Sequence, residues 1–235
     1  MRCFQRARQP AEIAQRRQAI LDAAAELLQS EGIANVSLNS IARHVGLAKS
    51  NVYRYFESRE KIFLDVLIAD TQNWVSALER ALLPLAGSND ADAVAQAITD
   101  SVVAAPRLCQ LVSALGSVIE QNVSEETMVE FKTSVLGVAI RLVNAFHLAL
   151  PKLPAADLIG FLRSLYALIT GLWPMAHPSP VAAKVLERPE FAPLRTSFDR
   201  DMHSAIRLVI RGFLSEREPT RERPRDVVQA TASEY

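Results

Sequence analysis

The sequence predicts an all-α protein. Apolar residues recur at helical spacing almost throughout the chain, and the alternation that marks β-strands is absent. Pro and Gly residues fall where the helical pattern stops, so they separate a series of helices. The 235 residues are enough for a sizeable core in one or two domains.

The N-terminal region predicts three helices in succession. The first carries an apolar stripe made of Ile20, Ala23, Ala24, Leu27 and Leu28. Gly32 follows at the position of a left-handed C-terminal cap. Ser37 can cap a second helix, which Gly46 ends, and a third helix covers roughly Lys49 to Tyr55.

A longer fourth helix is predicted for about Ser58–Leu83, because Ser58 can cap it and Pro84 ends its pattern. Later helical patterns cover residues 90–105, 107–121, 125–149, 155–173, 180–187 and 198–215. We therefore expect one domain at residues 11–57 and a second at 58–215. The charged, Pro-containing segment 216–235 is expected to be a flexible tail.

The net charge of zero hides an asymmetry along the chain. Residues 1–61 hold 10 Lys and Arg against 6 Asp and Glu, a net charge of +4, and the remainder carries the opposite charge. A basic segment on a neutral protein indicates contact with a polyanion, although so modest a cluster is also compatible with an ordinary solvated surface.

The sequence disfavours several other classes of protein. The basic N-terminus lacks the apolar core of a signal peptide, and no uninterrupted apolar run is long enough to span a bilayer. Cys3 and Cys109 lie far apart without partners at ligand spacing, which favours a reduced, cytoplasmic setting. No metal-ligand pairing, phosphate loop or catalytic constellation is evident. We therefore expect no enzymatic activity, metal, cofactor or membrane.

The most informative segment is residues 37–61, SLNSIARHVGLAKSNVYRYFESREK. Two short helices that cross closely need a small residue at the crossing, which Ala42 supplies, and a turn residue that tolerates positive φ, which Gly46 supplies. Val52 can point back into the core. The remaining face of the third helix then presents side chains of the kind that read base edges in the major groove.

The segment IARHVGLAKSNVYRYF, followed by ESREKIF, resembles the DNA-binding signature of the TetR family, and the similarity extends from Ile20 through Leu64. The resemblance implies a three-helix helix-turn-helix DNA-binding domain, a connecting fourth helix and a C-terminal helical ligand-binding and dimerisation domain. It also implies a homodimer that binds a palindromic operator in double-stranded DNA and is released by a small molecule. Repression is the common activity in the family and is therefore expected.

Matched onto this sequence, the resemblance implies a recognition helix at Ala48–Tyr55. The residues expected at base edges are Lys49, Ser50, Asn51 and Arg54, with Asn39 from the preceding helix. The residues expected at phosphates are Ser37, Tyr53, Tyr55 and Arg59. Ala48 departs from the Ser or Thr that is common in the family, so one cap or phosphate contact is expected to be missing.

The second domain contains no motif that resembles the family. Four residues are candidate walls of a cavity for an apolar or amphipathic effector: Trp74, Cys109, Phe131 and Trp173. Ordinary core packing is the alternative for each of them. The cavity is expected to border the Trp74–Leu82 half of the fourth helix and segments within 107–175.

Small residues recur at helical spacing near the end of the chain, at Gly160, Ser164, Ala167 and Gly171. Together with Ile206, Val209 and Phe213 of the final helix, this stripe is the expected dimer interface. The alternative is that the stripe packs inside its own subunit. A second class of function also stays open, namely a helical enzyme or adaptor that carries a helix-turn-helix module.

Overall fold

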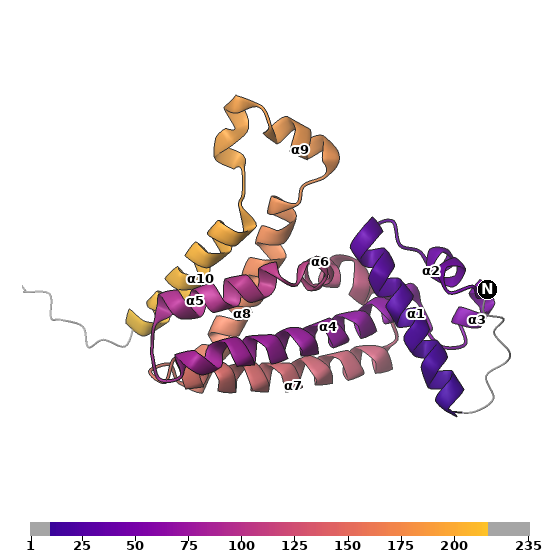
Figure 1. Cartoon of the computed structure of the whole chain (residues 1–235), viewed down its shortest axis with the longest axis horizontal. Helices are drawn as coiled ribbons and strands as arrows, with labels where there is room; N and C mark the ends of the chain where they lie inside the picture. Colours follow the sequence, from indigo (N-terminus) through magenta and orange to yellow (C-terminus); the bar gives the residue numbers. More distant parts are fainter. Residues whose placement is uncertain (1–9, 216–235) are drawn as a thin grey trace, which may run out of the picture.

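The computed structural model describes residues 10–215, and within that part of the chain it contains helices, turns and no β-strand. The prediction of an all-α protein is therefore confirmed. The predicted flexible tail, residues 216–235, lies outside the described residues, as does Cys3. Figure 1 shows an elongated body of helices with a smaller group of helices at one end.

Three helices form the smaller group, which we call the N-terminal unit (residues 10–57). They are α1 (Pro10–Glu31), α2 (Leu38–His44) and α3 (Lys49–Val52). The apolar stripe predicted for α1 is buried, and it belongs to the same apolar core as Ile41 of α2 and Val52 of α3. Full burial of such a side chain stabilises a fold by about 1.5–3 kcal/mol, so this core determines how the three helices sit together.

Glycine and serine residues shape the turns of the N-terminal unit. Gly32 and Gly46 have φ values of +75° and +70°, in the left-handed region that favours glycine. Ser37 caps α2, because its Oγ accepts a hydrogen bond from the Ser40 N–H at 3.1 Å. In return the Ser40 Oγ accepts from the Ser37 N–H at 2.8 Å. These local bonds determine how α2 leads into α3.

The third helix is shorter than the sequence predicts. It was expected to reach Tyr55, but α3 ends at Val52 and the chain continues in a turn. Ala48 occupies the N-cap position and provides no side-chain hydrogen bond to the first turn. Because N-cap side chains stabilise short helices, the missing cap is consistent with a helix of little more than one turn.

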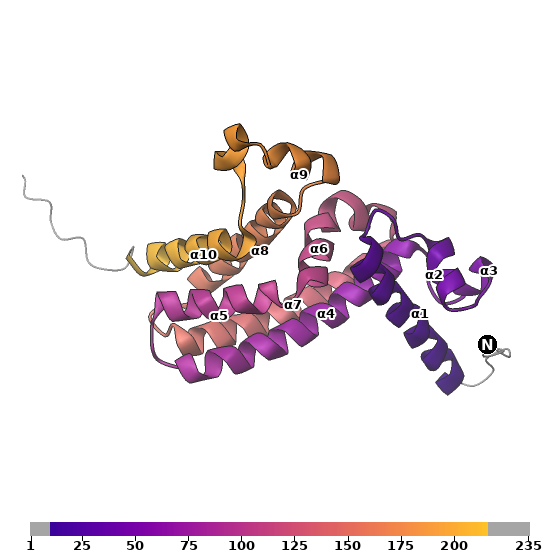
Figure 2. The same cartoon turned by 45° about the horizontal axis from the view of Figure 1, so that its top comes forward.

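Seven α-helices form the remainder of the described chain, which we call the helical body (residues 59–215). They are α4 (Arg59–Leu82), α5 (Ala91–Val103), α6 (Pro106–Ala114), α7 (Glu125–Ala149), α8 (Ala155–Ala176), α9 (Pro180–Leu186) and α10 (Phe198–Ser215). Figures 1 and 2 show α4 and α7 side by side along the body. α5 packs on α4, α8 packs on α7, and α10 packs against both α5 and α8.

The region after α6 departs from the single helix predicted for residues 107–121. α6 ends at Ala114 and is followed by a π-helical turn (Leu115–Ile119) and a 3-10 turn (Glu120–Asn122). Leu115 and Ile119 are both buried, so the wider turn keeps two apolar side chains in the core. π-helical turns are rare and occur frequently at functional sites.

α8 continues beyond its predicted end at residue 173 and contains Pro174 in its last turn, where proline removes one backbone hydrogen bond shortly before the helix ends at Ala176. By length and mean composition, α8 is apolar enough to cross a membrane, although Asp157 and Arg163 interrupt its apolar run. It packs against α6, α7 and α10, as a central helix of a helical domain does. Between α8 and α10, the chain forms a projection that contains α9 (Figure 2).

Candidate DNA-reading surface and effector cavity

The outer face of α3 carries polar side chains. Val52 is fully buried and holds α3 against the N-terminal unit, whereas Lys49, Ser50 and Asn51 are exposed. Arg54, in the turn that follows, is also exposed. These side chains match the contacts that read base edges, because Arg and Lys donate to guanine and Asn pairs with adenine.

The residues expected at phosphates and at the adjoining base flank this face. Tyr53 is 51% exposed, and its ring centroid lies 5.8 Å from Lys49 Nζ. Ser37 and Asn39 are exposed at the start of α2. Tyr55 is half-buried and packs against the core, so less of its side chain faces outward.

Arg59 is the expected phosphate contact that faces inward. Its Nη1 donates to the Val36 carbonyl at 3.0 Å, and its Nε and Nη2 donate to Glu60 Oε1 at 3.0 and 2.7 Å. Its guanidinium also lies 5.3 Å from the centroid of the Phe63 ring. These contacts tie the start of α4 to the loop before α2. The structure therefore gives Arg59 a positioning role in place of the phosphate contact expected from the sequence.

Arg107, at the start of α6, joins the N-terminal unit to the helical body. Its Nε and Nη2 donate to the two carboxylate oxygens of Asp70 in α4, at 2.7 and 2.6 Å. Its Nη1 donates to the Ala25 carbonyl of α1 at 3.3 Å. The hydrogen bonds to Asp70 favour the charged guanidinium and raise the pKa of Arg107. Three helices therefore meet at one side chain.

Glu57 makes a second connection between the two parts. Its Oε1 accepts a hydrogen bond from the backbone N–H of Ser124, the N-cap residue of α7, at 3.0 Å. This bond, followed by one from Thr127, stabilises the carboxylate and lowers the pKa of Glu57. Close by, Lys61 Nζ donates to Glu130 Oε2 of α7 at 3.0 Å. The N-terminal end of α7 is thus held against the N-terminal unit.

A largely apolar cavity of about 450 Å³ lies in the helical body between α4, α6, α7 and α8. Its aliphatic walls include Leu67, Leu108, Val112, Leu142, Leu162 and Ile169. Ligand sites of proteins are typically concave, mostly apolar and about 300–1,000 Å³ in volume. The cavity therefore has the size and the lining of a small-molecule site.

Few polar groups reach this cavity. Thr71 Oγ1 is engaged with the Leu67 carbonyl at 2.7 Å. Trp74 donates from Nε1 to Ser101 Oγ at 2.9 Å. The charged groups of the lining are an ion pair, in which Lys132 Nζ lies 2.5 Å from Glu120 Oε1. The polar character of the cavity is therefore concentrated at one place in its wall.

Trp74 and Phe131 line the cavity, but the other two residues proposed for its wall do not. Cys109 is fully buried in the core, where its Sγ–H donates to the Val102 carbonyl at 3.4 Å. Burial raises the pKa of its thiol to about 12. Trp173 stacks on His177 with the ring centroids 3.7 Å apart, beyond the cavity walls.

The cavity also lies closer to the N-terminal unit than expected. It was expected to border residues 74–82, but it contacts α4 at Leu67, Thr71 and Trp74. Farther along α4, Leu78 and Leu82 are buried in the core instead. The pairing of Glu120 with Lys132 could not be predicted from the sequence, because the two residues are twelve positions apart on different elements and no local pattern joins them.

The residues expected at the dimer interface do not share one surface. Ala167 and Gly171 are exposed, and Ser164 and Val209 are half-buried. A Cβ at Gly160 would lie 3.2 Å from Phe213 Cζ of the same subunit. Ile206 is fully buried. α10 lies along part of the small-residue stripe and covers it, which corrects the expectation for Gly160, Ile206 and Phe213.

An exposed apolar surface remains on α8 and α10. Ile159 and Tyr166 of α8 are each 47% exposed, and Leu208 of α10 is 63% exposed. Ala167 and Gly171 of α8 are also exposed, whereas Tyr166 additionally lines the cavity. A helix face of this composition is suited to contact with another protein surface.

The N-terminal unit presents a short polar helix, and α4 and α6 join this unit to a body that contains an apolar cavity. This arrangement is that of a helix-turn-helix regulator with a ligand-sensing domain. Residues 20–66 match the family model described as bacterial regulatory proteins, tetR family. Residues 69–217 match the model described as tetracyclin repressor-like, C-terminal domain. The chain therefore belongs to the TetR family, whose members are generally non-enzymatic, dimeric DNA-binding regulators with small-molecule effectors.

Solved structures show the same fold at low sequence identity. A protein from Rhodococcus sp. RHA1 described as a transcriptional regulator superposes with a TM-score of 0.59 and 15% identity, over 83% of this chain and 94% of that one. A TetR-family regulator from Streptomyces coelicolor superposes with a TM-score of 0.52 and 19% identity, over 86% of this chain and 98% of that one. A TetR/AcrR-family regulator from Thermobifida fusca superposes with a TM-score of 0.51 and 18% identity, over 85% of this chain and 98% of that one. The sequence has no significant match among curated proteins.

Proposed function

We propose that this protein is a homodimeric repressor that binds a palindromic operator in the cytoplasm and is released when an apolar or amphipathic molecule enters the cavity. The observation that carries the proposal is the position of the cavity. Its walls include α4 and α6, the two helices that Arg107 connects to α1. A ligand that changes their spacing therefore changes the position of α3.

Release requires that the ligand prefer the form that does not fit the operator, since a ligand with equal affinity for both forms shifts neither. α4 is the mechanical link in this proposal, because it begins at the N-terminal unit and passes along the cavity. Glu57 and Ser124 add a second link through α7.

On the DNA side, we assign base contacts to the exposed face of α3 and its turn, with Asn39 alongside. The base-reading residues are Asn39, Lys49, Ser50, Asn51 and Arg54. Tyr53 and Ser37 are assigned to phosphate contacts, and Tyr55 is assigned to a phosphate contact at the edge of this face. A two-fold pair of such units fits half-sites about one helical turn apart, roughly 34–36 Å, or a multiple of that distance.

For the dimer, we assign the outer face of α8 around Ala167 and Gly171, with Leu208 of α10. A two-fold interface requires a self-complementary surface outside the DNA-binding unit. Small residues let two helix axes approach closely, and the exposed apolar side chains beside them would be removed from water.

The test is the affinity of the full-length protein for labelled duplexes, measured by fluorescence anisotropy. One duplex carries the DNA upstream of its own gene, and a second carries a scrambled sequence. We expect tighter binding to the first and a linear fall of log affinity with log salt concentration, because phosphate contacts release counterions. Arg54→Ala should reduce the preference for the first duplex by about 1–3 kcal/mol, whereas Arg188→Ala, an exposed arginine in the projection, should keep it unchanged.

If the two duplexes bind with equal affinity at every salt concentration, the operator does not lie upstream of the protein's own gene, and it is then sought with a random-sequence selection. A selection that enriches no sequence would overturn the DNA-reading assignment. The alternative class, a helical enzyme or adaptor, gains no support from the family, whose members are generally non-enzymatic regulators.

A further inference from the structure

A cation of the protein itself occupies one end of the cavity. The Lys132 ammonium lies 2.5 Å from Glu120 Oε1 and 5.3 Å from the centroid of the Phe131 ring, and all three residues line the cavity. A carboxylate together with the face of an aromatic ring is a favourable site for a positive charge. The wall therefore contains a cation site that an amine of the chain fills.

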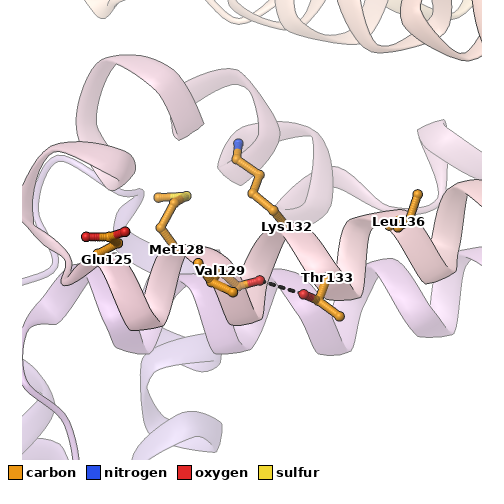
Figure 3. Close-up of a pocket in the computed structure, with 6 residues that line it drawn as sticks. All are labelled: Glu125, Met128, Val129, Lys132, Thr133 and Leu136. Carbon is orange, nitrogen blue, oxygen red and sulfur yellow. Dashed lines mark hydrogen bonds between the residues drawn. The ribbon is translucent and has the colours of Figure 1, made fainter.

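The Lys132 side chain has a second place that it can occupy. Its side chain is 56% exposed, against 30% for Glu120, and it also lines a shallow groove of about 350 Å³ on the outer side of α7. Figure 3 shows Lys132 extending from α7 on the same side as Met128, with Glu125 at the end of the groove. Exposed ion pairs contribute only about 0–1 kcal/mol, so Lys132 can leave Glu120 at little cost.

The chain around this ion pair is acidic. Residues 115–135 contain four glutamates and one lysine, Lys132, and of these glutamates Glu130 pairs with Lys61 of α4 while Glu120 alone lines the cavity. When the Lys132 side chain turns into the groove, Glu120 becomes the single charged group in the described lining of the cavity. Trp74 and Tyr166 supply further aromatic surface to the same cavity. This combination attracts a cation and opposes an anion.

We propose that the effector is a cationic amphiphile whose apolar part fills the cavity and whose positively charged head group replaces the Lys132 ammonium at Glu120. This inference rests on the proposed function, because it names the chemical class that the cavity takes. Glu120 precedes Ser124 by four residues, and the Ser124 N–H holds Glu57 of the N-terminal unit. The head group therefore acts on the short segment that touches the DNA-reading part.

The experiment compares three amphiphiles with the same decyl chain, namely decyltrimethylammonium, 1-decanol and decanoate. Each is titrated below its micellar concentration into the full-length protein and followed by calorimetry. We expect the ammonium to bind about tenfold more tightly than decanol, and decanoate to bind more weakly than decanol. Decyltrimethylammonium should also release the operator at the concentrations at which it binds.

Two variants and one control assign the effect to the ion pair. Glu120→Gln should reduce the affinity for the ammonium to that for decanol and leave decanol binding unchanged, which also shows that the cavity is still folded. Lys132→Met should increase the affinity for the ammonium, because the competing internal cation is gone. Glu126 is an exposed carboxylate on α7 outside the cavity lining, so Glu126→Gln should change neither the affinity for the ammonium nor the affinity for decanol.

Equal affinity for the three probes, or an unchanged ammonium affinity in Glu120→Gln, overturns the inference. If the probes bind equally and Ala139→Trp, which fills the cavity, abolishes binding, the cavity still serves as the effector site and only the head-group assignment fails. If no probe binds, the head-group assignment and the cavity as a site for amphiphiles fail together, while operator binding is judged from the anisotropy measurements alone.

Discussion

The carboxylate of Glu57 and the backbone N–H of Ser124 are joined by a hydrogen bond of 3.0 Å that crosses from the N-terminal unit to the N-terminus of α7. A helix N-terminus has unpaired N–H groups and a partial positive charge, so a carboxylate is the favoured partner there. One residue of the DNA-reading part thus caps a helix that also lines the cavity.

The first prediction concerns the pH dependence of this contact. The pKa of Glu57 is lowered, so its stabilising effect is fully present above its unfolded-state pKa of about 4.5 and is lost as the pH falls through the lower native value. Glu57→Gln should reduce the unfolding free energy by about 0.3–1 kcal/mol at pH 7. Urea titrations from pH 7 to 3 should show this difference shrinking in acid.

Glu190→Gln, an exposed carboxylate in the projection, is the control and should show no such difference. If the free energy of unfolding of Glu57→Gln stays below that of the unmodified protein by the same amount down to pH 3, the charge of Glu57 plays no part in the contact.

The second prediction separates base reading from phosphate contact. Arg54→Ala and Lys49→Ala should each lose about 1–3 kcal/mol of operator binding and relax the preference at one base pair. Tyr53→Phe should weaken operator and random duplexes alike, because phosphate contacts carry no sequence information. Anisotropy titrations against single-base operator variants measure both effects. Unchanged selectivity in both alanine variants would refute the assignment.

The third prediction uses the contact between Gly160 and Phe213. Replacing a helical glycine by alanine stabilises a helix by about 1 kcal/mol, but a Cβ here would meet the Phe213 ring at 3.2 Å. Overpacking typically costs about 1–3 kcal/mol, so Gly160→Ala should bring no gain. In a Phe213→Leu background the same change should stabilise by about 1 kcal/mol.

Urea unfolding at one fixed protein concentration gives the four free energies of this double-mutant cycle. Additive effects of the two substitutions would show that the ring and the glycine are not in contact in solution.

The fourth prediction tests the dimer surface without disturbing the subunit core. Ala167 is exposed on the single subunit, so Ala167→Glu should leave the helical circular dichroism unchanged. In a dimer it would place two like charges across the interface, and light scattering should therefore report the mass of a monomer. Ala81→Glu, on the exposed side of α4, is the matched control. A variant that stays dimeric would remove this face of α8 from the interface.

The fifth prediction concerns Cys109. Its thiol is fully buried and its pKa is raised to about 12, so almost no thiolate is present at pH 8. In a Cys3→Ser background, alkylation by iodoacetamide should be very slow in buffer and fast in urea above the unfolding midpoint. Mass spectrometry measures both rates. Rapid modification of the folded protein would show that the core opens near α6.

The features that the sequence determined by itself are local or repeat along one helix. The Ser37 cap and the positive φ of Gly46 depend on residues three or four positions away, so their signals are complete within a short window. The apolar stripe of α1 and the burial of Val52 follow from helical spacing in the same way. The family signature lies in this part of the chain, so the DNA-reading surface was largely predictable.

Only the tertiary structure decided which surface covers each apolar face and which distant charges meet. The pairing of Glu120 with Lys132, the contacts of Arg107 with α1 and α4, and the approach of Phe213 to Gly160 join residues far apart in sequence. Cys109 and Trp173 show the same limit, since an apolar side chain is equally suited to a core, a cavity wall or an interface. The hydrophobic effect is non-directional, so periodicity identifies an inward face but not its neighbour.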